Sequence, residues 1–86
     1  MRAMKLPKYA KFREEKFCGV LFETRSEKVF TLNPTAAAVV REIAAGGDES
    51  AIIGRLKERF RDDGDAIERE AVAFIAELRQ KGLLED

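Results

Sequence analysis

Few side chains in this sequence could act as a nucleophile, an acid–base pair or a metal ligand. The 86-residue chain has no histidine and a single cysteine, Cys18. Catalytic arrangements that pair histidine with serine or cysteine are therefore excluded. The same composition excludes a structural zinc site built from cysteine and histidine, and also a disulfide within the chain. We expect no enzymatic activity, no bound metal and no cofactor.

The remaining reactive groups have simpler interpretations. Cys18 has Lys16 nearby, as a reactive thiol would need, but a lone cysteine in a strand is more often a small buried apolar residue. The acidic pairs Glu14-Glu15 and Asp62-Asp63 resemble parts of an acid–base or magnesium site. Adjacent carboxylates without a second converging cluster are usually solvated, so neither pair predicts catalysis.

The charge balance gives the chain no general affinity for polyanions. It carries 16 basic and 16 acidic residues, so its formal net charge is zero. Basic residues gather near the start, at Arg2, Lys5, Lys8, Lys11 and Arg13. Such a segment can contact nucleic acid or an acidic partner, but it is more typical of a solvated tail and of an edge strand that lysines keep soluble.

The hydropathy pattern predicts a cytoplasmic protein without a membrane partner. The longest apolar runs are much shorter than the roughly 18 residues of a membrane helix. Residues 1–16 lack the hydrophobic stretch of a secretory signal. We expect one small domain over residues 8–84, preceded by a flexible tail over residues 1–7.

The elements change from strands to helices along the chain. Alternating apolar residues predict strands at 10–14, 17–23 and 28–32, with the last two forming a hairpin. Asn33-Pro34 then predicts a helix start, because asparagine is a good N-cap and proline fits the first helical position. This helix is expected to run to about Ala45 and to end at Gly46-Gly47.

Two further helices follow. Asp48 is the expected N-cap of a helix whose apolar stripe is Ile52, Ile53, Leu56 and Phe60. Asp65 is expected to begin the third helix, with Glu68 in capping-box position, and Gly82 to end it in the left-handed conformation. The apolar stripe of the third helix is Ile67, Ala71, Phe74 and Leu78, broadened by Val72 and Ile75, and Leu83-Leu84 is expected to fold back onto its last turn.

Three short strands followed by three helices predict a small α+β domain of winged helix-turn-helix type. The main functional alternative for this fold is a DNA-binding transcription regulator. The third helix, however, opens with Asp65, Glu68 and Glu70 against the single Arg69, and these carboxylates would repel phosphates. We therefore do not expect nucleic acid as a partner.

An exposed sheet edge favours peptide binding instead. If the strand at 28–32 is an edge, an extended peptide can add to it as a further strand, beside a wall formed by the third helix. The open side of that helix is expected to show Val72 and Ile75 between the charged Glu68 and Arg79.

Three runs of sequence resemble the PqqD family. They are Lys16-Phe17-Cys18-Gly19-Val20-Leu21-Phe22, then Val29-Phe30-Thr31-Leu32-Asn33-Pro34-Thr35-Ala36, and Phe74-Ile75 with Leu78 and Gly82-Leu83-Leu84. The resemblance covers residues 8–84. It implies a non-catalytic chaperone that binds the leader of a ribosomally synthesised precursor peptide and presents it to a modifying enzyme, often a radical S-adenosylmethionine enzyme.

The resemblance also implies where the leader binds. It would add as an antiparallel strand to the third strand, in the groove that this strand forms with the third helix. The implied peptide-binding residues are Lys28, Val29, Phe30, Thr31 and Leu32 of the strand, and Glu68, Val72, Ile75 and Arg79 of the helix. The oligomeric state is left open.

Overall fold

The computed structural model of the chain describes residues 4–16, 18–61 and 64–85. An antiparallel sheet of three strands, in the order β1-β2-β3, precedes three helices. This confirms the predicted α+β arrangement. The elements are β1 (Ala10–Glu14), β2 (Gly19–Glu23), β3 (Lys28–Leu32), α1 (Pro34–Ala45), α2 (Glu49–Arg59) and α3 (Gly64–Gln80).

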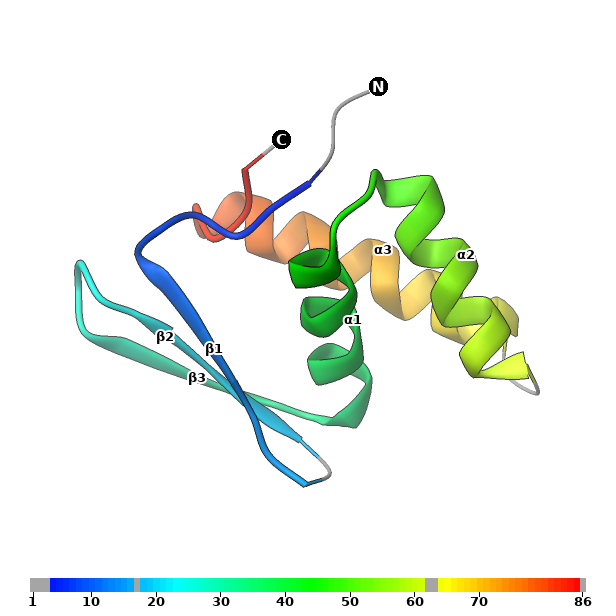
Figure 1. Cartoon of the computed structure of the whole chain (residues 1–86), viewed down its shortest axis with the longest axis horizontal. Helices are drawn as coiled ribbons and strands as arrows, with labels where there is room; N and C mark the ends of the chain where they lie inside the picture. The colour runs from blue at the N-terminus through cyan, green and yellow to red at the C-terminus, as the bar shows by residue number, and fades with distance from the viewer. Residues whose placement is uncertain (1–3, 17, 62–63, 86) are drawn as a thin grey trace.

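Helix α1 lies between the sheet and the pair formed by α2 and α3 (Figure 1). In the sheet, Leu21 of β2 is paired with Phe12 of β1 and with Phe30 of β3. These three residues point to the same side of the sheet, because side chains in register share a face. That face packs on α1, where Val39 and Val40 are buried.

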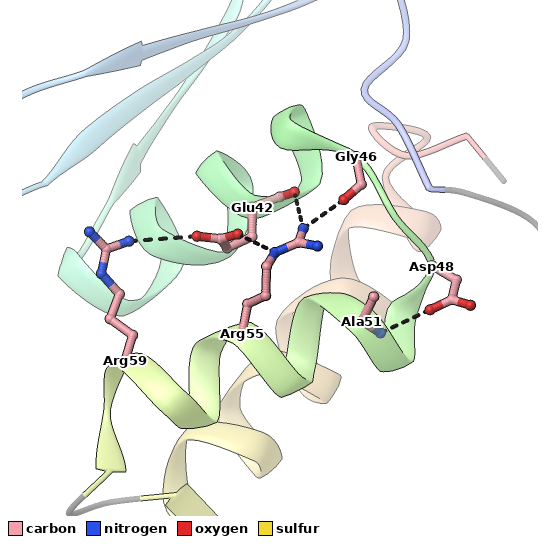
Figure 2. Close-up of polar contacts among 6 residues, drawn as sticks. All are labelled: Glu42, Gly46, Asp48, Ala51, Arg55 and Arg59. Atoms are coloured by element: carbon pink, nitrogen blue, oxygen red, sulfur yellow. Dashed lines mark hydrogen bonds and ion pairs between the residues drawn. The ribbon is translucent and has the colours of Figure 1, made fainter.

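The predicted caps of the first two helices are present. The side chain of Asn33 accepts a hydrogen bond from the Ala36 amide at 2.8 Å. The side chain of Asp48 accepts one from the Ala51 amide, also at 2.8 Å (Figure 2). Each cap satisfies an amide that has no partner within the helix, and this fixes where α1 and α2 begin.

The start of α3 differs from the prediction. The helix begins at Gly64 rather than at Asp65, and Glu68 is turned toward α2. Its carboxylate accepts a hydrogen bond from Lys57 Nζ at 2.9 Å, so the ion pair between helices takes the place of the expected capping box. The other end of α3 is as predicted, since Gly82 has a φ of 73° and the Leu83 amide bonds to the Leu78 carbonyl.

A group of charged residues joins α1 to α2. Figure 2 shows Glu42 of α1 between Arg55 and Arg59 of α2, with Arg55 Nε 2.6 Å from the Glu42 carboxylate. Arg55 also donates to the main-chain carbonyls of Glu42 and Gly46. Because Arg55 satisfies carbonyls at the end of α1, it fixes the angle at which the chain turns into α2.

Residues 4–7, expected to belong to a flexible tail, pack against the core. Met4 is 1% exposed and its amide bonds to the Gly47 carbonyl at 3.0 Å. Lys5 forms an antiparallel bridge with Glu85, so the beginning of the described chain lies beside its end. The apolar side chains of Met4 and Pro7 explain this, since both are buried.

Candidate functional site

The two edges of the sheet differ in charge. Three of the five residues of β1 are charged, namely Lys11, Arg13 and Glu14, whereas β3 has Lys28 alone. Charged side chains on an edge strand hinder the addition of another strand. Within the described residues, no strand pairs with the outer side of β3. Another strand can therefore add more easily to the β3 edge than to the β1 edge.

A groove runs between β3 and α3. Its narrow end is a hollow of about 140 Å³ whose lining includes Phe30 of β3 and Phe74 of α3. Its wide end is an open depression of about 880 Å³ beside the start of α1. The two hollows share Phe74 and Glu77, so they are adjacent, and we call them together the β3–α3 groove.

The narrow end of the groove has an apolar base and a charged rim. The base is formed by side chains of the core, Leu21, Leu32, Leu78 and Leu83. On the rim, Lys81 Nζ lies 3.1 Å from the Glu77 carboxylate and 5.0 Å from the centre of the Phe30 ring. An apolar side chain could enter here, with one cation and one carboxylate beside it.

The wide end of the groove is lined by residues 33–36 and by the flank of α3 that carries Glu70. Glu70 is exposed, and no cation of the described residues lies within ion-pair distance of it. At the wide end, the Glu70 carboxylate therefore has no ion-pair partner among the described residues, whereas at the narrow end Glu77 is paired with Lys81.

Helix periodicity explains why this flank of α3 faces the groove. Glu70, Phe74, Glu77 and Lys81 follow one another at intervals of four, three and four residues, so they share one stripe of the helix. The adjacent stripe, with Ile67, Ala71 and Leu78, is buried in the core. The core contacts thus orient α3, and the orientation turns Phe74 and Glu77 toward β3.

The strand residues predicted to bind a peptide have different positions. Lys28, Val29 and Thr31 are exposed, and Val29 is 60% exposed. Phe30 is half-buried and lines the groove. Leu32 is 4% exposed and belongs to the core, so it can offer a bound peptide its main chain but little of its side chain.

The four predicted helix residues are not brought together with β3. Glu68 pairs with Lys57 of α2, and their hydrogen bond raises the pKa of Lys57 above its usual value. Arg79 lies 3.2 Å from Glu49 of α2. Both charged residues therefore lie on the side of α3 that faces α2.

The two apolar residues of α3 that were predicted to bind a peptide, Val72 and Ile75, differ in burial. Ile75 is 0% exposed, so the expectation that it lies on the open side of α3 is wrong, because the core contacts of α3 include this position. Val72 is 42% exposed, on the same side as Glu68 and Arg79 by helix spacing.

Sequence reasoning missed three residues of the groove. Phe74 was assigned to the core because it is a large apolar residue, but it is only half-buried. Glu77 and Lys81 were not considered for the site. The signal that could have found them is their spacing of three and seven residues from Phe74, which places all three on one stripe.

Three further observations concern the other kinds of site considered from the sequence. Cys18 is half-buried. Among the described residues, no group of three or more acidic or cysteine side chains is arranged to hold a metal ion. None of the described helices is both long and apolar enough to cross a membrane. The acidic pair Asp62-Asp63 lies outside the described residues.

Comparison with known protein families places most of the chain in a described family. The family profile described as "Coenzyme PQQ synthesis protein D (PqqD)" matches residues 18–84. This span contains β2, β3 and all three helices, and thus both walls of the β3–α3 groove. No curated protein and no solved structure matches the chain.

Proposed function

The chain belongs to the PqqD family, and on this premise we propose that it is a chaperone for the leader region of a ribosomally synthesised precursor peptide. Membership supports a peptide-binding accessory role, without catalysis, in the biosynthesis of pyrroloquinoline quinone or another modified peptide. The proposal adds how the leader binds and what receives it, namely a peptide-modifying enzyme such as a radical S-adenosylmethionine enzyme.

The observation that carries the proposal is the unpaired outer side of β3 beside the β3–α3 groove. In an edge strand, every second residue directs its main-chain N–H and C=O groups away from the sheet. An extended leader can pair with these groups and become a fourth strand. Antiparallel addition is favoured, because antiparallel pairs are slightly more stable and the existing sheet is antiparallel throughout.

The side chains of the leader would provide specificity. Alternate residues of an added strand point to the same face, so one set would enter the groove toward Phe30 and Phe74. We therefore propose β3 (Lys28–Leu32) as the strand side of the site and Phe74, Glu77 and Lys81 as its helix side. Contacts of this kind typically correspond to micromolar or submicromolar affinity, about −8 kcal/mol or somewhat stronger.

The delivery role follows from the geometry of strand addition. A leader held along β3 is fixed over about five residues, and the rest of the precursor remains outside the groove. The part to be modified is then available to a separate enzyme while the leader is bound. The alternative of a DNA-binding regulator is disfavoured by the exposed carboxylates along α3, which include Asp65, Glu70 and Glu77.

The proposal is tested by isothermal titration of the purified chain with leader peptides. The candidates are the products of short reading frames that neighbour the gene of this chain, and a scrambled version of each is the control. We expect one leader to bind with micromolar or tighter affinity and to shift NMR signals of β3 and of the groove flank of α3. If no candidate binds, or if binding shifts signals elsewhere, the proposed function is wrong.

A further inference from the structure

The two ends of the β3–α3 groove have opposite charges. At the wide end, Glu70 has no cation of the described chain within ion-pair distance. At the narrow end, Lys81 lies over Phe30 and forms an ion pair with Glu77, so these two residues add no net charge. The positive charge of this end comes from Lys28 at the start of β3, which is exposed. A guest in the groove therefore meets a negative end and a positive end.

The direction of β3 determines which part of a bound peptide lies at each end of the groove. The wide end adjoins residues 33–36, which follow the last residue of β3, and the narrow end adjoins Phe30 and Thr31. An antiparallel guest runs against β3. Its N-terminal part would therefore lie beside Glu70 and its C-terminal part beside Lys81 and Lys28.

The spacing of the charges sets the length of the recognised segment. Glu70 and Lys81 are eleven positions apart in the chain, which corresponds to about 16 Å along a helix. A strand advances about 3.3 Å per residue, so this distance equals about five strand residues. Only even separations keep both guest side chains on the groove face, which leaves a separation of four or six residues.

We infer that the β3–α3 groove selects leader segments in which a basic residue comes first, an apolar residue follows, and an acidic residue comes four or six positions after the basic one. The basic side chain would pair with Glu70, and the acidic one with Lys81 or Lys28. The apolar side chain would fill the hollow between Phe30 and Phe74. This inference rests on the proposed function and names the class of peptide that the site takes.

Selection from a random peptide library tests the inference without knowledge of the natural leader. Extended peptides of about ten residues are selected on the purified chain, and binders whose affinity is lost in the Phe74→Ala variant are kept as groove binders. Their sequences are then aligned on the apolar residue. We expect basic residues to be enriched before it and acidic residues after it.

Charge-swapped peptides and matched variants complete the test. Exchanging the basic and acidic residues of a selected peptide should weaken binding about fivefold to thirtyfold, since two exposed attractions become repulsions. Glu70→Lys should remove the preference for the basic residue. Glu58→Lys makes the same charge change on α2 at an exposed position outside the groove, and should leave the preference intact.

The outcomes separate the inference from the function on which it rests. Groove binders with no charge order, or with the opposite order, would overturn the inference and leave the proposed function standing. Equal changes of the preference for a basic residue in Glu70→Lys and Glu58→Lys would likewise overturn the inference and leave the proposed function standing. If selection yields no groove binder at all, the proposed function fails, and the inference fails with it.

Discussion

The ammonium group of Lys81 lies 5.0 Å from the centre of the Phe30 ring, directly after α3 has ended. The Glu77 carboxylate, one turn earlier, forms an ion pair with this ammonium group, with Oε1 of Glu77 3.1 Å from Nζ of Lys81. A cation over an aromatic face is attracted by the ring electrons. The contact therefore links α3 to β3 across the narrow end of the groove, and a bound peptide side chain would share this environment.

Truncation of Phe74 should weaken leader binding. Phe74 lines both hollows of the groove, and buried aromatic anchors contribute most to binding sites of this kind. We expect Phe74→Ala to weaken affinity about tenfold, or about 1.4 kcal/mol, in isothermal titration with the leader. Val72→Ala is the matched control, because Val72 is an exposed apolar residue on the other side of α3. Equal losses in both variants would contradict the proposed site.

Two glycine-to-alanine changes should affect stability in opposite directions. A Cβ at Gly19 would lie 2.8 Å from Cε1 of Phe12 and 3.3 Å from Cβ of Ala37, so Gly19→Ala should lower the free energy of unfolding by about 1–3 kcal/mol through overpacking. Gly54 lies within α2 with nothing within 4 Å of its Cβ position. Gly54→Ala should raise stability by about 0.5–1 kcal/mol. Urea denaturation measures both, and a stabilising Gly19→Ala would refute the close contact.

Removal of the Tyr9 hydroxyl should destabilise the fold modestly. This hydroxyl donates a hydrogen bond to the Gly82 carbonyl, and the ring lies 3.5 Å below the Arg25 guanidinium. Tyr9→Phe keeps the ring and loses only the hydrogen bond, so we expect a loss of about 0.5–1.5 kcal/mol. Thermal and urea unfolding measure the change. An unchanged midpoint would show that this hydrogen bond does not stabilise the end of α3.

Glu23 should make stability depend on pH on the acid side. Hydrogen bonds from the Ser26 hydroxyl and the Arg25 guanidinium lower the pKa of Glu23 below its usual value of 4.5. A lowered pKa in the folded state stabilises the protein above the unfolded pKa, and this contribution is lost as the pH falls through the folded pKa. The loss should therefore begin near pH 4.5 and continue below it.

Glu23→Gln tests this pH dependence. The variant should be less stable than the parent near neutral pH, and the difference should shrink as the pH falls below about 4.5. Urea unfolding at a series of pH values gives both curves. Parallel curves would mean that Glu23 is not the group responsible.

Most of the fold could be predicted because the sequence features that determine its helix ends and strands lie within a few residues of each other. The Asn33 and Asp48 caps, the Gly82 terminator and the alternation in β3 each depend on neighbours within a few residues, and helix starts and ends are largely decided at that range. The predicted capping box at Glu68 is wrong for the opposite reason, because Glu68 pairs with a residue far along the chain. Its partner, Lys57, belongs to another helix.

The helix side of the candidate site could not be predicted from the periodicity of α3 alone. The apolar stripe of this helix is broad, and it includes Phe74 at one border and Val72 near the other. Which border faces β3 depends on how α3 packs on α1 and α2, and that is a tertiary relationship. The packing of the segment at Met4 and Lys5 could not be predicted for a similar reason, since the main-chain partners of these two residues are the distant Gly47 and Glu85.

The end of α3 is fastened to the beginning of the chain by Tyr9 and Gly82, and the residues just after it by the bridge between Lys5 and Glu85. These ties lie outside the groove, so they position the end of α3 without occupying the space beside β3. Binding of a leader should then require little movement of the α3 main chain. The association rate would then depend on how often a free leader is extended when it encounters the edge of β3.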